Sequence, residues 1–171
     1  MIICPFCSAE NIAGVDECEE CGQSLSDSHL DAPASEVEEH LLNDHIQVLK
    51  PKKPFAVAPD ASVGEVLKLM VANGIGCVMV ADGDKPVGIF SERDALLKLN
   101  TEASELSGRP VSEYMTANPE TLEDSAKIAF AVQRMDLGGY RHVPIVSEDG
   151  DMQSIISVRD ILRYLAEHMG V

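Results

Sequence analysis

The sequence predicts an α+β protein: two copies of a helix-strand-strand-helix unit, preceded by a small segment with four cysteines. The main observation is an internal repeat, in which residues 88–94 (GIFSERD) recur as residues 154–160 (SIISVRD). Each copy reads as a strand that runs into a helix beginning at a serine. Because neither copy can cover its apolar face alone, we expect the two to pack as a pseudo-twofold pair that encloses clefts.

The first copy contains one predicted element after another with turn signals between them. Asp60 precedes a run of apolar residues at helical spacing and can cap that helix. Asp82-Gly83 favours a tight hairpin, because both residues tolerate a left-handed backbone. The predicted elements are an extended segment at 55–57, a helix at 62–73, strands at 77–81 and 87–90, and a helix at 92–99.

The second copy follows when the sequence is shifted by 66 positions. This shift aligns residues 78–80 with 144–146 and the two hairpin turns without a gap. Asp124 stands before the first helix as a candidate cap, and Asp149-Gly150 predicts the turn. The predicted elements are a helix at 125–137, strands at 142–146 and 152–156, and a helix at 158–168.

The order of elements and the G-h-x-S/T-x-x-D phrase that closes each copy resemble the CBS domain, a regulatory module. The resemblance covers about residues 43–170 and includes residues 111–115 and the strand GGYRHVPIV at 138–146. It implies two CBS repeats whose sheets face each other. It also implies clefts that hold adenosine-containing ligands such as AMP, ADP, ATP or S-adenosylmethionine, and homodimers formed through the helices.

Four residues of the repeated phrase are candidate ligand contacts. Ser91 and Ser157 stand where a strand turns into a helix, and the free amides at that point attract phosphate. One turn later, Asp94 and Asp160 can accept hydrogen bonds from the two hydroxyls of a ribose. The alternative is a local capping arrangement that never meets a ligand. The sequence leaves both interpretations open.

The two copies differ around this phrase. Ser154 replaces the glycine that the family pattern has, which predicts a narrower second cleft. Arg141 and His142 begin the first central strand of the second copy, where the first copy has Ile75 and Gly76. The guanidinium of Arg141 is a candidate phosphate contact, and His142 is a candidate for phosphate binding or for pH sensing.

The amino terminus carries Cys4-x2-Cys7 and, ten residues later, Cys18-x2-Cys21. Four thiolates from two tight knuckles suit tetrahedral zinc and leave no open coordination position for catalysis. The stretch resembles a short zinc ribbon, predicted at residues 1–25 and folded by its metal. Iron in a rubredoxin-like site, a pair of disulfides and redox-active CxxC pairs are the alternatives. No signal peptide or membrane span is visible, so we expect a cytoplasmic protein with reduced thiols.

Between the ribbon and the repeats we expect a linker and a short helix at residues 26–42, with Ser35 as the helix cap. His40 and His45 are five residues apart, which does not place both on one helical face, so they are interpreted as surface histidines. Cys77 is expected in the core. The predicted domains are 1–25, 26–42, 43–105 for the first CBS repeat and 106–171 for the second.

Composition limits the partners. The net charge is −16, and Lys50 is the only Lys or Arg among residues 1–50. Duplex nucleic acid is therefore excluded, because it is bound by clustered basic side chains. No constellation for catalysis is present, so we expect no enzyme. The predicted function is regulatory sensing of an adenosine nucleotide, with the zinc ribbon contacting a protein partner. The alternative is a ligand-free dimerisation scaffold that displays zinc ribbons. Ligand identity, cleft occupancy and the partner are not determined by the sequence.

Overall fold

The computed structural model describes residues 2–4, 6–7, 9–12, 15–25 and 35–170. Most of the predicted linker, residues 26–34, lies outside the described residues. The predicted helix that follows it is present as α1 (Glu36–Asn43), and the Ser35 hydroxyl caps it by accepting a hydrogen bond from the Glu38 amide at 3.2 Å. Every helix in the described part of the chain is too short or too polar to cross a lipid bilayer.

The chain divides into two compact units that do not follow the repeats in sequence. The amides of Ile46 and Ile128 donate to the carbonyls of Ala126 and Asp44, each at 2.9 Å, so the first residues of the predicted first repeat pack with the second. Val111, after the first repeat, donates to Ala61 at 2.8 Å. Unit 1 comprises Met1–Pro51, Leu122–Val143 and Ile156–Val171, and unit 2 comprises Lys52–Thr121 and Pro144–Ile155.

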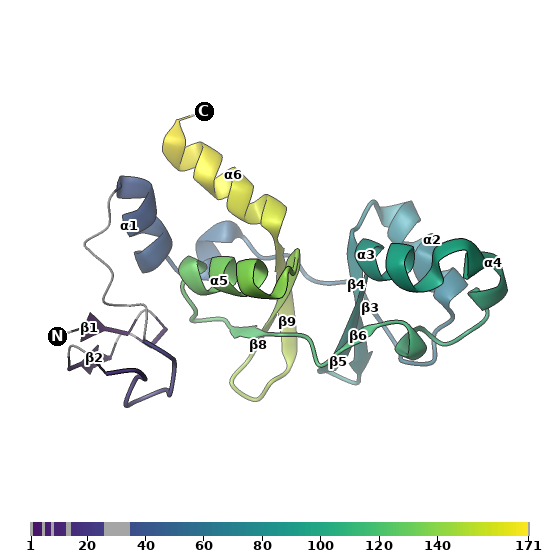
Figure 1. The fold of residues 1–171 in the computed structure, drawn as a ribbon, viewed down its shortest axis with the longest axis horizontal. Coiled ribbons are helices and arrows are strands. Elements are labelled where there is room, and N and C mark those ends of the chain that lie inside the picture. Colours follow the sequence, from purple (N-terminus) through teal and green to yellow (C-terminus); the bar gives the residue numbers. More distant parts are fainter. Residues whose placement is uncertain (1, 5, 8, 13–14, 26–34, 171) are drawn as a thin grey trace. The chain divides into compact units, whose positions relative to one another are not determined.

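Unit 2 is built on a four-stranded sheet in the order β3-β4-β5-β6, whose helices lie on one face (Figure 1). β3 runs parallel to β4, and the other pairs are antiparallel. The core joins the buried faces of α2 and the strands, with Val66, Val80 and Phe90 fully buried. The elements are β3 (Ala56–Val57), α2 (Val63–Asn73), β4 (Cys77–Asp82), β5 (Lys85–Ser91), α3 (Glu92–Asp94), α4 (Ala103–Leu106) and β6 (Thr116–Ala117), with a 3₁₀ helix at Val111–Glu113.

The second helix of the first repeat is broken into short turns. After α3, a π-helical turn (Ala95–Leu99) and a 3₁₀ turn (Asn100–Glu102) lead into α4. Asn100 has φ of 45°, which a regular helix does not allow. The predicted single helix at 92–99 is therefore present in position but irregular in form.

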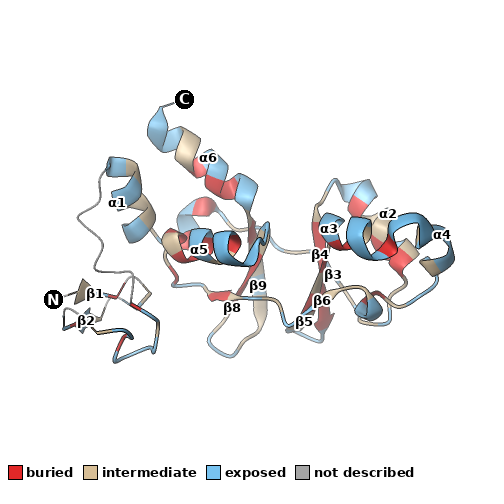
Figure 2. Ribbon diagram, viewed as in Figure 1, coloured by how far each residue is buried: buried red, intermediate tan, exposed pale blue. Residues whose placement is uncertain are grey.

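Unit 1 contains the cysteine segment, three helices and part of a second sheet, ordered β7-β8-β9, of which residues 144–155 belong to unit 2. α1 and α5 pack together, and both contact α6. Buried residues concentrate on the helix faces and strands that meet one another (Figure 2). The elements of unit 1 and of this sheet are β1 (Ile2–Ile3), β2 (Glu10–Asn11), α1, a 3₁₀ helix (Ile46–Leu49), β7 (Leu122–Glu123), α5 (Ile128–Gly138), β8 (His142–Val146), β9 (Met152–Ser157) and α6 (Val158–Met169).

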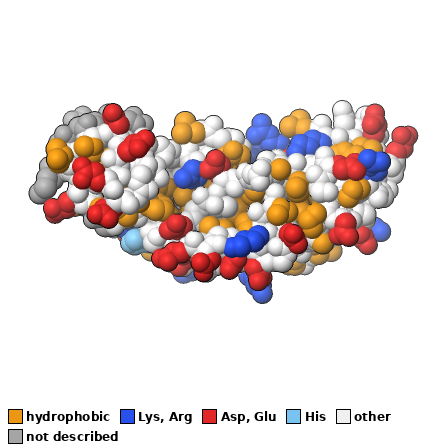
Figure 3. Space-filling model, turned by 90° about the horizontal axis from the view of Figure 1, so that it is seen from below, with side chains coloured by type: hydrophobic (Ala, Val, Ile, Leu, Met, Phe, Trp, Pro, Cys, Tyr) orange, Lys and Arg blue, Asp and Glu red, His pale blue; other side chains and the backbone are white. Residues whose placement is uncertain are grey.

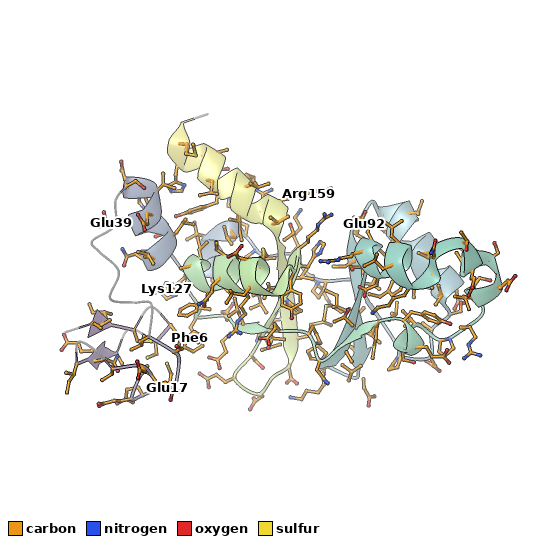
Figure 4. All side chains as sticks on the ribbon, viewed as in Figure 1. Phe6, Glu17, Glu39, Glu92, Lys127 and Arg159 are labelled. Carbon is orange, nitrogen blue, oxygen red and sulfur yellow. The ribbon has the colours of Figure 1, made fainter. Side chains whose placement is uncertain are left out.

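The predicted acidic caps of the first helix in each repeat are wrong. α2 begins at Val63, and its N-cap is Ser62, which exchanges hydrogen bonds with Glu65 in a capping box. α5 begins at Ile128, three residues later than predicted, and its N-cap is Lys127, which makes no side-chain cap. The Lys127 ammonium instead donates to the Asn43 carbonyl at 2.8 Å, which ties the start of α5 to the end of α1 (Figure 4). The N-cap is the residue at which the chain enters the helix, and here tertiary contacts determine where the helix begins.

Candidate functional site

The four predicted metal ligands of the amino terminus come together. The Sγ atoms of Cys4, Cys7, Cys18 and Cys21 all lie within 4.8 Å of one another. The Cys4 and Cys21 sulfurs are 3.7 Å apart, and those of Cys7 and Cys18 are 3.5 Å apart. Sulfurs about 2.3 Å from a zinc ion in a tetrahedral shell stand about 3.8 Å from one another. The spacing of the four sulfurs therefore fits a four-thiolate metal site.

The backbone around the cysteines supports this geometry. β1 pairs with β2, and Gly22 adopts φ of 69° after the second cysteine pair. The Cys21 amide, followed by the Glu20 amide and the Asn11 side chain, hydrogen-bonds the Cys18 sulfur and lowers its pKa to about 6. Burial shifts the pKa of Cys7 and Cys21 the other way, to about 12 for Cys21, so of these three thiols Cys18 is the one already favoured as the thiolate, the form that binds metal.

The described residues of this cysteine segment form only a small apolar core. Its buried cluster consists of Cys4, Cys18 and Leu25, with Phe6 partly buried beside them. Phe6 also meets Phe130 of α5 edge to face, with ring centroids 5.6 Å apart (Figure 4). A metal is the natural source of stability for a segment with so small a core.

In the first repeat, Asp94 is buried, with 7% of its surface exposed, and both of its carboxylate oxygens have partners. Its Oδ2 accepts from the amide and hydroxyl of Ser91 at 3.0 and 2.6 Å. Its Oδ1 accepts from the Thr116 hydroxyl at 2.9 Å and pairs with the Lys98 ammonium at 2.7 Å. A carboxylate offers about four lone pairs, so these four bonds use them all.

In the second repeat, Asp160 has the same burial but fewer partners among the described residues. It is 6% exposed, and its Oδ2 accepts from the amide and hydroxyl of Ser157 at 2.8 and 2.7 Å. Its Oδ1 accepts one bond, from the Arg163 guanidinium at 2.6 Å. One lone pair of Oδ1 is left over for a further donor.

The pKa of both carboxyls is lowered. Burial raises the pKa of Asp94, but hydrogen bonds from Lys98, Ser91 and Thr116 outweigh it. Burial likewise raises the pKa of Asp160, and the bonds from Ser157 and Arg163 outweigh it. Both side chains are therefore ionised at neutral pH and act only as acceptors. Both repeats hold the local capping arrangement, so a ligand must share or displace these bonds.

Arg141 is placed beside the second motif by the backbone. Its carbonyl accepts from the amide of Val158, the first residue of α6, at 2.9 Å. In the first repeat the matching bond runs from Glu92 to the Gly76 carbonyl at 3.0 Å. Arg141 is exposed and His142 is partly buried. The second repeat therefore carries a cation where the first carries no side chain.

These bonds also correct the ungapped alignment, which paired Arg141 with Ile75. Gly76 is the structural match because the second hairpin is one residue longer. In the first repeat Asp82 pairs with Lys85 across a two-residue turn, and a bulge follows at Val80/Ala81. In the second repeat the Ser147 amide donates to the Asp151 carbonyl at 2.9 Å, which closes a wider loop.

Three partners of the motif carboxylates were not identified from the sequence. Lys98 and Arg163 lie four and three residues after their aspartates, a spacing that brings side chains together on a helix and could have revealed them. Thr116 reaches Asp94 from β6, and only the pairing of β6 with β5 brings it there. No sequence spacing indicates that contact.

The remaining surface is acidic. Acidic side chains spread along the face drawn in Figure 3, and Lys and Arg side chains occur there in separate places. Asp16, Glu17, Glu19 and Glu20 are all exposed in the cysteine segment. Cys77 is 8% exposed in β4, and burial raises its pKa to about 12, which keeps it an inert thiol.

Comparison with known proteins decides the family. The family model for CBS domains matches residues 46–100 and 111–167. The chain belongs to the CBS-domain family. A CBS-domain protein of Agrobacterium tumefaciens has a similar structure, with a TM-score of 0.65 and 30% identity, covering 71% of this chain and 98% of that one. A CBS-domain protein of Pyrobaculum aerophilum, solved in complex with AMP, has a TM-score of 0.63 and 26% identity, covering 72% and 99%.

The curated relatives of this CBS-domain chain differ in length. An uncharacterised 17.7 kDa protein of Acidianus ambivalens is 29% identical over 116 residues, which are 67% of this chain and 69% of that protein. A CBS domain-containing protein of Arabidopsis thaliana and an uncharacterised protein of Methanopyrus kandleri are longer than this chain. The matched part is 21% of the first and 55% of the second. The matches with CBS proteins confirm the predicted fold class, two CBS repeats in an α+β protein.

Proposed function

We propose that this protein is a regulatory sensor that binds an adenosine-containing nucleotide at the Ser-x-x-Asp motif of its second CBS repeat. The observation that carries the proposal is the ionised, buried carboxylate of Asp160, which keeps one acceptor position. The exposed Arg141 adds a positive charge to the same repeat. A relative of 26% identity was solved in complex with AMP, which supports an adenine nucleotide as the ligand. S-adenosylmethionine is a further candidate of the same class.

Each group has a specific role in this proposal. The free lone pair of Asp160 Oδ1 accepts a ribose hydroxyl, while Ser157 holds the other oxygen in place. The Arg141 guanidinium contacts phosphate, and His142 lies beside it in the chain. In the first repeat, Asp94 has no acceptor position left and Gly76 adds no charge, so Ser91 and Asp94 form the weaker site. We therefore expect one nucleotide per chain.

Calorimetric titration of the purified protein with AMP, ATP and S-adenosylmethionine tests the proposal. The Asp160→Asn variant is expected to lose binding, because an amide has one acceptor oxygen and a donating NH2 group where the carboxylate has two acceptor oxygens. Asp94→Asn is the matched control and is expected to bind normally. Equal loss in both variants would contradict the preference for the second repeat. Bound nucleotide is expected to be recovered unchanged, since we propose a sensor and not an enzyme.

The second part of the proposal is a structural zinc ion held by Cys4, Cys7, Cys18 and Cys21. The sulfur spacing fits it, and four thiolates complete its coordination shell. Metal analysis should find one zinc ion lost in Cys18→Ser, and hydrogen exchange of that variant should show residues 2–25 unprotected while the repeats stay protected. Cys77→Ser is the control that keeps the metal. Iron in place of zinc would be visible in the absorption spectrum.

We further propose a homodimer formed through the helices, with the ribbon contacting a protein partner. Large apolar side chains are exposed on helical elements of both units, among them Leu96, Leu137 and Leu162. Covering them in a dimer would remove apolar area from water. Light scattering should give a dimer for the wild type and a monomer for Leu162→Glu or Leu96→Glu.

The main alternative is a dimerisation scaffold that displays two zinc ribbons and binds no ligand. Hydrogen bonds within the protein fill every acceptor position of Asp94, which favours the ligand-free alternative for the first repeat. Failure of all three nucleotides to bind a zinc-loaded dimer would establish the scaffold and exclude the sensor.

A further inference from the structure

A second cluster of metal-ligating side chains lies far from the cysteines in the chain but within unit 1. It joins His40 of α1, Asp44 just after α1, and His168 near the end of α6. One possible ligand atom from each residue lies within 4.8 Å of the others. The sequence suggested weighing His40 with His45, but His45 turns to the Ser125 carbonyl and Lys127 instead. The partner of His40 is His168, from the other end of the chain.

Two of the possible ligand atoms are separated by almost the distance expected between two ligands of one metal ion. His40 Nδ1 is 3.7 Å from Asp44 Oδ2, and the rings of His40 and His168 have centroids 4.8 Å apart. Ligands about 2.0–2.1 Å from a tetrahedral zinc ion are about 3.3 Å from one another. The His168 side chain is exposed, and its ring lies beside that of Tyr164, with ring centroids 4.1 Å apart.

Hydrogen bonds orient two of the three ligands. His168 Nδ1 lies 2.8 Å from the Tyr164 carbonyl, which can only accept, so Nδ1 carries the proton and Nε2 keeps a lone pair for a metal. Asp44 Oδ2 accepts from the Tyr164 hydroxyl at 2.6 Å, which fixes the carboxylate against α6. A histidine that donates its second nitrogen to a carbonyl, beside a hydrogen-bonded carboxylate, is the usual support of a protein metal ligand.

We infer that His40, Asp44 and His168 bind a divalent transition-metal ion of the zinc type and so clamp α1 to α6. Two imidazoles and one carboxylate suit this class, whereas calcium and magnesium prefer oxygen ligands alone. Three protein ligands leave a position for water. Glu36 Oε1 is 4.0 Å from His40 Nε2 and adds negative charge that favours the cation. The inference does not depend on nucleotide binding or on the cysteine site.

Zinc titration of the full-length protein, with its cysteine site already loaded, tests the inference. One further zinc ion per chain is expected, together with a rise in the unfolding temperature. Absence of this additional equivalent would overturn the inference directly, without any variant. His168→Gln and His40→Gln are each expected to lose the additional ion, and His45→Gln, the matched control, is expected to keep it. Retention of the ion in both cluster variants would place it elsewhere and overturn the inference.

Cobalt separates the two metal sites spectroscopically. Cobalt bound by cysteines shows intense thiolate-to-metal charge-transfer bands, and cobalt bound by imidazole and carboxylate shows only weak d–d bands. Cys18→Ser is expected to abolish the charge-transfer bands and keep the weak bands, and His168→Gln is expected to do the reverse. If the weak bands are absent in Cys18→Ser, the histidine cluster holds no metal, whatever the cysteine site does.

Discussion

The two Ser-x-x-Asp motifs share one local structure and differ in what surrounds them. In both, a serine at the end of a strand donates its amide and hydroxyl to an aspartate three residues later. Asp94 then receives Lys98 and Thr116, whereas Asp160 receives Arg163. The capping arrangement is therefore the same in both copies. Contacts from neighbouring elements fill every acceptor position of Asp94 and leave one position of Asp160 for a ligand.

The helices that follow the motifs differ in the same way. α6 continues for twelve residues, while the first repeat passes through a π-helical turn and a 3₁₀ turn within the matching stretch. The π-helical turn holds Lys98, the residue that pairs with Asp94. Irregular helix of this kind occurs often at functional places, but here it accompanies the motif with fewer acceptor positions. A repeat can thus keep the sequence of the Ser-x-x-Asp motif while its aspartate has no acceptor position left for a ligand.

The largest expected effect comes from the core residues just before each serine. Phe90 is fully buried and Ile156 is 1% exposed, and each anchors the strand that presents its motif. Phe90→Ala is expected to cost about 3–5 kcal/mol of unfolding free energy and Ile156→Ala about 2–5 kcal/mol, measured by urea denaturation. Val48→Ala, at a half-exposed site, is the control. Loss below 1 kcal/mol in either core variant would show that its strand is not firmly packed.

The next effect comes from the motif carboxylates. Asp94→Asn weakens bonds to three residues and leaves Lys98 without its charged partner, and Asp160→Asn weakens bonds to two. A hydrogen bond to a charged group contributes about 1.5–3 kcal/mol, so we expect Asp94→Asn to destabilise the protein more. Chemical denaturation without nucleotide measures the difference. The reverse order would contradict the idea that Asp94 is the structurally committed copy.

The pH dependence of stability sharpens the same comparison. Both aspartates have lowered pKa values in the folded state, so their contribution is complete above the unfolded pKa of about 3.9. It is lost as the pH falls through the folded pKa. The difference in unfolding free energy between wild type and Asp94→Asn should stay constant above about pH 5 and shrink at lower pH. A difference that does not change with acid would show that Asp94 is not the titrating group.

The smallest expected effect comes from the cations. The Lys98 side chain is 39% exposed and that of Arg163 is 51% exposed, so each ion pair contributes only about 0–1 kcal/mol. Lys98→Ala and Arg163→Ala should therefore barely change stability in urea. Lys98→Ala also frees one acceptor position on Asp94, and calorimetry should then detect nucleotide binding at the first repeat. If no such binding appears, the missing cation at Gly76 limits that site.

Much of the candidate site could be predicted from spacing alone. The cysteine pairs, the Ser35 cap and both Ser-x-x-Asp motifs are local in sequence, so their geometry follows from a few backbone turns. Both interpretations of the motifs were visible, and the structure shows that the capping one is present in each copy. The lone Gly22 after the second cysteine pair also adopts the left-handed conformation that such a turn requires.

The contacts that could not be predicted join residues distant in sequence. Thr116 reaches Asp94 through the pairing of β6 with β5, and His168 reaches His40 through the packing of α6 against α1. The one-residue difference between the hairpins moved Arg141 to the position of Gly76, because a loop changes length without changing the strands that it joins.

The sequence by itself determined the repeat, the four thiol ligands and the residue types of each motif, because all of these depend on local backbone geometry and hydrophobic periodicity. Only the tertiary structure decided which acceptor positions remain on Asp94 and Asp160, and that two histidines 128 residues apart in the chain meet at Asp44. Those outcomes follow from the packing of helices and strands, whose free energy depends on surfaces that the linear order of residues does not bring together.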